Sequence, residues 1–247
     1  MFNSPDDHED YRKFERWVKT DAGEFAVEQK RALLEQLIAG WTRRGHNILE
    51  VGCGVGYLLE AFWEAGLDIS GLDASQMHLD KARERLGNRV DLVLGEPEHL
   101  PFEDEEFDYV AVLNPLGFTA DPEPILREAF QVARKGVVFG FFNKYSLHRL
   151  SCFYNRKNCS FHALHWHSCV HMLSLVKKIS GGLRGSIRST LFGPPGTWGN
   201  EKKLWRKING AILPTPFGAY VALRVDLARR PGVKPLYLTT RAPVGAE

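Results

Sequence analysis

Three glycines at alternate positions, Gly52, Gly54 and Gly56, have a spacing that indicates ligand binding. They follow an apolar stretch that ends in Glu50, and they precede a segment in which apolar residues recur at helical spacing. Glycine permits positive φ angles and lets a ligand approach the backbone, while the first turn of a helix offers free N–H groups and the positive end of a dipole. The turn therefore suits a nucleoside-like ligand that carries a carboxylate or a phosphate.

Two classes of nucleoside cofactor compete for such a turn. A dinucleotide fingerprint needs a glycine or alanine three residues after its second glycine, but Tyr57 and Leu59 occupy those positions here. This departure disfavours a nicotinamide oxidoreductase. Asp73 ends the next apolar stretch, and a carboxylate there can accept hydrogen bonds from both ribose hydroxyls of either class of cofactor.

Alternating strand and helix patterns must position these residues. Apolar stretches end near Glu50 and Asp73 and recur at 90–94, 107–113 and 136–142, with helix-like segments between most of them. This succession predicts β-α-β units and a parallel sheet. Two later stretches, at 187–192 and 219–227, alternate as strands and are expected to pair antiparallel.

The pattern Glu50-x-Gly52-x-Gly54-x-Gly56 resembles motif I of the class I S-adenosylmethionine (SAM)-dependent methyltransferases. Residues 95–108 are similar to the family's segment Gly-Asp-Ala-Glu-x-Leu-Pro-Phe and the acidic turn and Phe-Asp that follow it. The resemblance covers about residues 10–145 and is strongest to the methyltransferase-11 subgroup, which includes quinone-biosynthesis and small-molecule enzymes. It implies an α/β fold with a Rossmann-like seven-stranded sheet of order 3-2-1-4-5-7-6, the last strand antiparallel and helices on both faces.

The resemblance also implies a site for SAM, whose product is S-adenosylhomocysteine (SAH). Glu50 and the glycine turn would hold the methionine end, Asp73 the ribose and Glu96 the adenine amino group. The implied cofactor-binding residues are Glu50, Gly52, Cys53, Gly54, Gly56, Asp73, Ala74, Glu96, Pro97, Leu113 and Asn114. Pro97 replaces an alanine whose N–H donates to the adenine ring in the family. That hydrogen bond is therefore lost, replaced by water or made in another register.

For the domain organisation, we expect an N-terminal helical lid at 1–45 and a methyltransferase domain at 46–247. Insertions that face the substrate are expected at about 145–182 and 193–217. The methyl acceptor is expected to be small or lipid-like, and it could be anionic. Tyr145, His162 and His165 could take its proton if it is a hydroxyl or an acidic carbon.

Two other functions stay open. Asn114 and Pro115 resemble the start of the (Asp/Asn)-Pro-Pro-(Tyr/Phe) motif of nucleic-acid and protein N-methyltransferases, but Leu116 and Gly117 break the motif. A non-catalytic partner subunit with the same fold would be favoured by weak cofactor binding, which Pro97 would permit.

Cysteines and histidines crowd the stretch 152–171. His167 and His171 could share a helix face, but the stretch has no Cys-x-x-Cys pair, so no metal site is expected. Substrate-pocket histidines remain an alternative to ordinary helix and loop positions. Four cysteines are too few and too unevenly placed for a disulfide framework, which favours a reduced, cytoplasmic protein.

The net charge of +2 hides an asymmetry. Residues 143–247 carry 17 Lys and Arg against three acidic residues, whereas residues 1–142 carry 15 against 27. A basic half suggests an anionic partner, although a solvated dipolar surface would look the same. Residues 202–212 form a basic amphipathic segment that could lie on an anionic membrane surface. We expect no signal peptide, because the first ten residues are acidic and no hydrophobic stretch follows them. No apolar run reaches 18 residues, so we expect no membrane span, and we do not expect nucleic acid as a partner.

Overall fold

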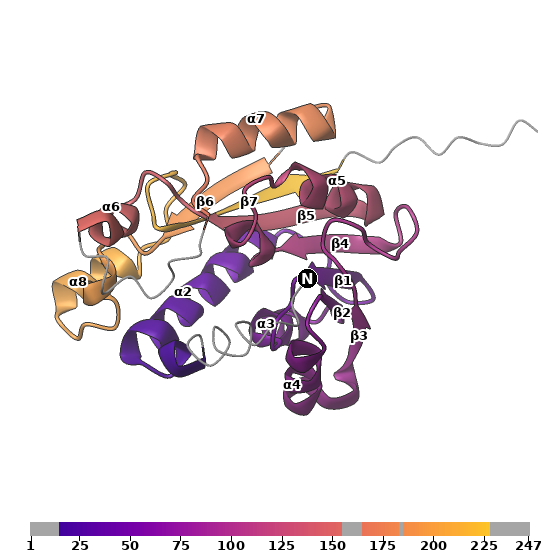
Figure 1. Cartoon of the computed structure of the whole chain (residues 1–247), viewed down its shortest axis with the longest axis horizontal. Coiled ribbons are helices and arrows are strands. Elements are labelled where there is room, and N and C mark those ends of the chain that lie inside the picture. Colours follow the sequence, from indigo (N-terminus) through magenta and orange to yellow (C-terminus); the bar gives the residue numbers. More distant parts are fainter. Residues whose placement is uncertain (1–14, 155–164, 183–184, 228–247) are drawn as a thin grey trace, which may run out of the picture.

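A seven-stranded sheet forms the centre of the molecule (Figure 1). The structure, a computed structural model, describes residues 15–154, 165–182 and 185–227. In spatial order the strands are β3 (Val90–Leu94), β2 (Asp68–Asp73), β1 (Asn47–Val51), β4 (Phe107–Val112), β5 (Ala133–Phe142), β7 (Tyr220–Asp226) and β6 (Gly185–Thr190). The first five strands are parallel, and β7 runs antiparallel to both β5 and β6. The predicted fold and strand order are confirmed.

Helices cover both faces of this sheet (Figure 1). One face packs against α2 (Asp21–Ile38), α3 (Tyr57–Glu64) and α4 (Gln76–Leu86), and the other against α5 (Glu123–Val132) and α7 (Cys169–Ser180). Strand β4 shows why both faces of the sheet are buried. Its residues Tyr109 and Ala111 belong to the hydrophobic core on one face, whereas Val110 and Val112 belong to the core on the other. The period of two along a strand thus divides one apolar run between two layers.

Two further helices, α6 (Leu147–Tyr154) and α8 (Lys203–Asn209), lie beyond the carboxyl end of β5. Short 3-10 turns occur elsewhere along the chain, at η1 (Gly87–Arg89), η2 (Pro115–Gly117) and η4 (Pro195–Thr197). Residues 145–182 were expected to form an insertion that faces the substrate. One helix of this segment, α7, instead packs on α5 as part of the core. Residues 1–14 of the expected lid lie outside the described residues, and the lid function of 1–45 stays a prediction.

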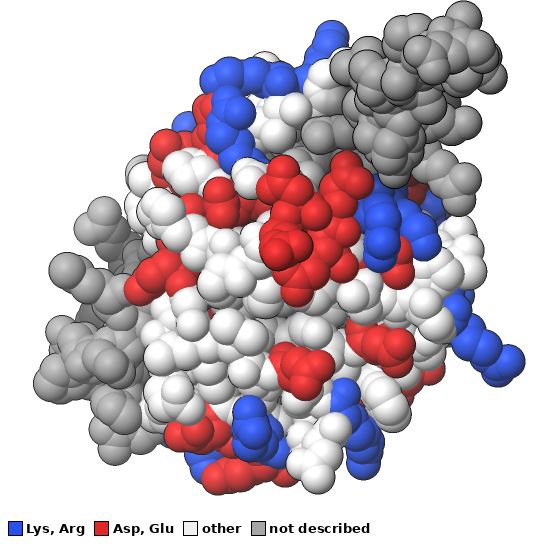
Figure 2. All heavy atoms as spheres, turned by 90° about the vertical axis from the view of Figure 1, so that its right-hand side faces the viewer, with Lys and Arg blue, Asp and Glu red and all other residues white. Residues whose placement is uncertain are grey.

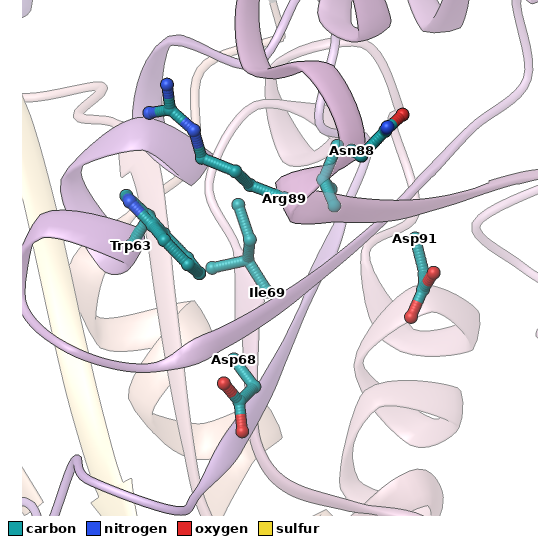
Figure 3. A pocket seen from close by; sticks show the side chains of 7 residues that line it. Trp63, Asp68, Ile69, Asn88, Arg89 and Asp91 are labelled. Carbon is teal, nitrogen blue, oxygen red and sulfur yellow. The ribbon is translucent and has the colours of Figure 1, made fainter.

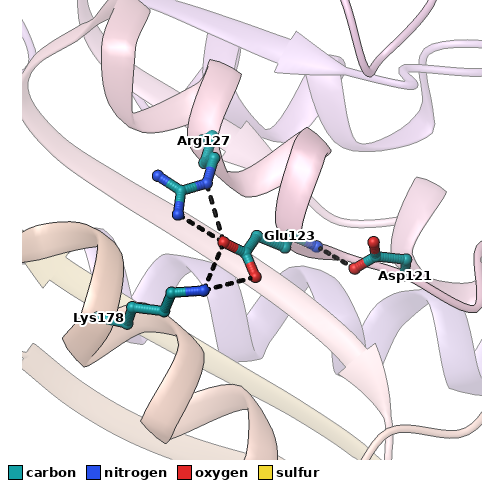
Figure 4. Close-up of polar contacts among 4 residues, drawn as sticks. All are labelled: Asp121, Glu123, Arg127 and Lys178. Atoms are coloured by element: carbon teal, nitrogen blue, oxygen red, sulfur yellow. Dashed lines mark hydrogen bonds and ion pairs between the residues drawn. The ribbon is translucent and has the colours of Figure 1, made fainter.

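Charged side chains fasten α7 to α5 on the face away from the glycine turn (Figure 4). The carboxylate of Glu123 accepts hydrogen bonds from Lys178 Nζ at 2.9 and 3.1 Å and from Arg127 on its own helix. Asp121, which lies two residues before α5, accepts a hydrogen bond of 3.1 Å from the backbone N–H of Glu123 in the first turn of that helix. Lys178 and Arg127 lower the pKa of Glu123, which shows that these cations favour its ionised form.

A second polar anchor joins the amino ends of the central strands. Asp108 accepts hydrogen bonds from the backbone of Asn47 and from Arg134, and Lys135 Nζ lies 2.9 Å from Asp108 Oδ1. The Asn47 side chain in turn accepts from the Asp108 backbone N–H at 2.7 Å. Burial is the largest single influence and opposes ionisation of this carboxyl, but the hydrogen bonds from Lys135 and Asn47 and the charges of Arg134 and Lys135 together outweigh it, and the pKa of Asp108 is lowered.

Acidic side chains gather on the surface beyond these amino ends. Figure 2 turns this side, the right of Figure 1, toward the viewer and shows several Asp and Glu side chains close together. The exposed acidic run 103–106 lies between β3 and β4. The predicted charge asymmetry thus includes an acidic surface on the side opposite α6 and α8.

Candidate active site

The glycine turn lies between β1 and α3, at the carboxyl ends of the parallel strands. Gly52, Gly54 and Gly56 have φ angles of 67°, 55° and 81°, a region that glycine adopts without the strain that a side chain would add. The backbone N–H groups of Gly52 and Cys53 donate to the carbonyl of Leu72 at 2.7 and 3.0 Å, which ties the turn to the end of β2. The turn has the strand–turn–helix form that its sequence predicts.

The first two glycines have different neighbours. A Cβ atom added at Gly52 would collide with the ring of Pro115, which follows β4. At Gly54 the same addition meets nothing within 4 Å, and Gly54 lines a pocket. Gly52 therefore serves packing between two strand ends, whereas Gly54 leaves open space for a ligand.

Asp73 ends β2 directly beside this turn. Its carboxylate accepts hydrogen bonds from the backbone N–H groups of Gly54 at 2.8 Å and Ser75 at 3.0 Å, and His78 Nδ1 lies 3.0 Å from Asp73 Oδ1. Ala74 is partly buried between these contacts. The acid therefore lies at the turn, as predicted, and its role toward a ribose stays a prediction.

Glu50 is the most unusual group of the site. It is 0% exposed, and neither of its carboxylate oxygens has a hydrogen-bond partner in the described part of the chain. Burial, and next the negative charge of Asp73, raise the pKa of Glu50 well above its usual value, while the ammonium of Lys30 and, more weakly, the nearby backbone of Leu59 act in the opposite direction. A buried carboxylate without partners is costly, so its presence calls for a cationic or proton-donating ligand.

Lys30 supplies a cation to the same site, from α2. Its ammonium lies over the rings of Phe142 and Tyr220, 4.8 and 4.4 Å from their centroids. Burial lowers the pKa of Lys30 to about 8, against the attraction of Glu50. Lys30 was not among the residues predicted from the sequence, although it follows Ala26 by one helical turn on the apolar side of α2 and could have been found there.

A largely apolar pocket joins these groups. Its lining comes from α2 and the segment before it, from the glycine turn and the start of α3, and from the end of β4: Trp17, Val27, Lys30, Cys53, Gly54, Val55, Tyr57, Leu58 and Asn114. Three of the predicted cofactor residues, Cys53, Gly54 and Asn114, therefore border one space. In open α/β sheets ligands bind at this carboxyl edge.

A larger hollow of about 250 Å³ lies elsewhere, between the starts of β2 and β3 (Figure 3). Asp68, Asp91 and Arg89 are among its lining residues, and Trp63 lies at its side. Because it opens at the amino ends of these strands, it contains none of the predicted site residues.

The other predicted cofactor residues lie at the ends of β3 and β4. The carbonyl of Leu113 accepts a hydrogen bond of 2.8 Å from the Tyr220 hydroxyl. Glu96 is exposed just after β3 and Pro97 is partly buried, while the Gly95 N–H donates to the Asp73 carbonyl at 3.1 Å. Their contacts to adenine stay predictions.

The predicted proton acceptors do not line the pocket. Tyr145 is 66% exposed, His165 is exposed, and His162 lies outside the described residues. His167 is buried and donates from Nε2 to the Leu116 carbonyl at 2.6 Å. Burial lowers the pKa of His167, so its neutral ring serves as a structural link.

A histidine that we did not single out from the sequence, His148, lies among aromatic rings near the pocket. Its ring meets those of Trp166 and Trp198 edge-to-face at 4.8 Å and that of Phe142 at 6.2 Å. We call Phe142, His148, Trp166 and Trp198 the aromatic cluster. Its members come from four separate segments, so only the fold brings them together.

Cysteines depart from one expectation. Cys53 and Cys169 are free and buried, but Cys152 is disulfide-bonded, so the prediction of fully reduced cysteines is wrong at Cys152. Among residues 15–154, 165–182 and 185–227, no three His, Cys, Asp or Glu side chains are grouped so that they could hold a metal ion. Within those same ranges every helix is too short or too polar to span a lipid bilayer.

Comparisons with known proteins agree with this geometry. Residues 49–141 match the family model described as a methyltransferase domain. The methyltransferase GfsG of Streptomyces halstedii is 35% identical over 124 residues, which cover 47% of this chain and 42% of GfsG. The ubiquinone biosynthesis O-methyltransferase of Azoarcus sp. (strain BH72) is 34% identical over 106 residues, 40% of this chain and 46% of that protein. The chain thus spans less than half the length of these two relatives.

A solved structure extends the likeness to the whole sheet. The magnesium protoporphyrin IX methyltransferase of Synechocystis PCC 6803 with bound SAH superposes with a TM-score of 0.64, covering 88% of this chain and 94% of that chain at 14% identity. At this identity the likeness concerns the fold. Residues 49–141 therefore match a methyltransferase domain, and the rest of the chain shares the fold of the solved structure.

Proposed function

We propose that this protein is a SAM-dependent methyltransferase that acts on a small-molecule acceptor. The observation that carries the proposal is the buried carboxylate of Glu50, which has no hydrogen-bond partner among the described residues and lies near the end of the strand that leads into the glycine turn. SAM carries an ammonium group, a carboxylate and a nucleoside, and the site offers a group for each of them.

The residues present fit this cofactor. Glu50 would pair with the ammonium, and Lys30, which lines the pocket, would pair with the carboxylate. Asp73 would accept from the ribose hydroxyls if it exchanges its present hydrogen bonds, and Glu96 would accept from the adenine amino group. Gly54 leaves the open space that a close approach to the backbone requires.

When bound, SAM supplies a methyl group that its sulfonium charge already activates. The chain's task is therefore mainly to align the acceptor and exclude water. Trp17, Val27 and Leu58 give the pocket apolar walls, which favour exclusion of water. The Tyr220 hydroxyl holds the Leu113 carbonyl in place at the end of β4 and so fixes the strand end that faces the cofactor in the family.

A small-molecule acceptor is supported by the apolar pocket and by the printed function of the Azoarcus relative, an O-methyltransferase of ubiquinone biosynthesis. We further propose that a lipid-like or anionic acceptor, or an anionic surface, meets the side of α6 and α8. Leu204 there is 65% exposed and has basic neighbours, Lys203 and Arg206. Sedimentation with vesicles of phosphatidylglycerol, compared with phosphatidylcholine, tests this contact, and equal recovery with both would contradict it.

Asp73→Ala tests the cofactor assignment directly. We expect the variant to bind SAM at least about tenfold more weakly, because the ribose loses its acceptor. Asp91→Ala, which removes an exposed acid on the neighbouring β3, serves as the matched control and should bind normally. Unchanged affinity in Asp73→Ala would reject the ribose role. If the wild type binds neither SAM nor SAH, the partner-subunit alternative replaces this proposal, and Pro97→Ala becomes the first variant to make.

A further inference from the structure

The side chain of His148 has an unmet need for a hydrogen bond. It is 5% exposed, and its Nδ1 atom has no hydrogen-bond partner among the described residues. Neighbouring polar atoms are satisfied, since Trp198 Nε1 donates to the Gly193 carbonyl at 3.0 Å and Tyr220 donates to Leu113. Buried polar atoms in folded proteins are nearly always paired, and among the described residues only the Glu50 carboxylate shares this lack of a partner, so the exception at His148 points to a ligand.

The aromatic cluster is continuous with the cofactor pocket. Phe142 packs against His148 on one side and against Tyr220 at 5.5 Å on the other. Tyr220 reaches the end of β4, and Lys30, which lies over both the Phe142 and Tyr220 rings, lines the pocket. A molecule bound at His148 would therefore lie next to the space assigned to the cofactor.

The surroundings restrict the chemistry of that molecule. Burial, and next the charge of Lys30, lower the pKa of His148 to about 4, so the ring is neutral at pH 7 and presents one donor and one acceptor. A hydroxyl can match either nitrogen. An ammonium group would be repelled by Lys30, and an ionised carboxylate would have to be stripped of water among aromatic rings.

The arrangement of the rings in the aromatic cluster favours a planar ligand. Trp166, Trp198 and Phe142 meet the His148 ring at interplanar angles of 78°, 72° and 74°. A planar aromatic molecule can continue this edge-to-face packing.

We propose that the aromatic cluster is the acceptor side of the site and that it binds a phenol, whose hydroxyl forms a hydrogen bond with His148. The proposal rests on the proposed function, because it names the acceptor class of that same site. The proposed site includes none of the proton acceptors expected from the sequence. Tyr145 and His165 are exposed, and His162 lies outside the described residues.

The test measures binding of 4-nitrophenol to protein saturated with SAH. Nitrobenzene, which lacks the hydroxyl, and 4-nitrobenzoate, which carries a carboxylate, are compared by calorimetry. We expect 4-nitrophenol to bind the wild type most tightly. His148→Phe keeps an aromatic ring at this position and should weaken 4-nitrophenol binding about tenfold while leaving nitrobenzene within about twofold. His165→Phe, at an exposed histidine, should change neither.

Each outcome has a defined meaning. Tighter binding of 4-nitrobenzoate, or equal binding of 4-nitrophenol and nitrobenzene by the wild type, overturns the phenol assignment even if the variant fails to fold. Equal affinity of wild type and a folded His148→Phe variant for 4-nitrophenol removes His148 from the site. Failure of SAH itself to bind would instead contradict the proposed function, so the two failures are distinguishable.

Discussion

Two carboxylates on adjacent central strands differ completely in their surroundings. Asp108, at the amino end of β4, is 6% exposed and has partners on Asn47, Arg134 and Lys135, so its pKa is lowered. Glu50, near the carboxyl end of β1, is 0% exposed, has no hydrogen-bond partner in the described chain, and has a raised pKa.

The difference separates stability from function. At the amino end of the strands, the buried charge of Asp108 is compensated by partners within the protein, as expected for a structural anchor. At the carboxyl end Glu50 and His148 are both left without partners, which lowers stability unless a ligand supplies them. Unpaired buried groups are thus gathered at the end of the sheet where a ligand would bind.

The largest effect on stability should follow from removing the structural acid. Asp108→Ala leaves Arg134, Lys135 and the Asn47 backbone without their shared acceptor, and we expect the free energy of unfolding to fall by about 3 kcal/mol. Urea denaturation measures the change. Glu50→Gln is the comparison, and it should leave stability unchanged or raise it, because a buried charge becomes neutral. A larger loss in Glu50→Gln than in Asp108→Ala would reverse our assignment of the two ends.

The next largest effect concerns His148 and acid. Its pKa is about 4 in the folded protein against 6.5 for the ordinary side chain, so between these values the unfolded chain binds a proton that the folded chain does not. Lowering the pH through this window should therefore lower the free energy of unfolding, by up to about 3 kcal/mol at ~1.4 kcal/mol per pH unit. His148→Phe should lose this part of the acid sensitivity, whereas His165→Phe should keep it. Identical pH dependence in wild type and His148→Phe would disprove the burial argument.

The glycines of the turn should show a smaller version of the same contrast. Gly52→Ala collides with Pro115 and should cost about 2 kcal/mol of stability. Gly54→Ala adds only the strain of a positive φ, about 1 kcal/mol, but its methyl group enters the open space and should weaken SAM binding more than its effect on stability suggests. Thermal unfolding and SAM titration of both variants give the two numbers. If Gly54→Ala binds SAM normally, the cofactor does not approach the backbone there.

The sequence predicted most of the fold because the relevant signals are local. Apolar runs of strand length, glycines at strand ends and the acids Glu50 and Asp73 are each read within a few residues, and the strand order followed from the family resemblance. The glycine turn and the position of Asp73 at the end of the second strand were therefore expected before the structure, whereas the hydrogen bond between them was not.

The acceptor side could not be read in this way. Tyr220 reaches Leu113 across 107 residues of sequence, and the aromatic cluster joins four segments. Tyr145 was preferred because it follows a predicted strand, and His162 and His165 because they lie in the stretch rich in Cys and His, but burial depends on packing that local patterns do not encode. Lys30 is an intermediate case, since a lysine on the apolar side of a helix is visible in the sequence although its partners are not.

Calorimetric titration of wild type and Glu50→Gln with SAM tests the central claim most directly. If a ligand supplies the missing partner of Glu50, the wild type should bind SAM in the micromolar range and the variant at least about thirtyfold more weakly, although the variant is no less stable. Glu98→Gln, a change at a partly buried acid beyond β3, provides a control for the loss of one negative charge. Equal affinity of wild type and Glu50→Gln, or no binding by the wild type, would contradict the claim that the unpaired carboxylate marks the cofactor site.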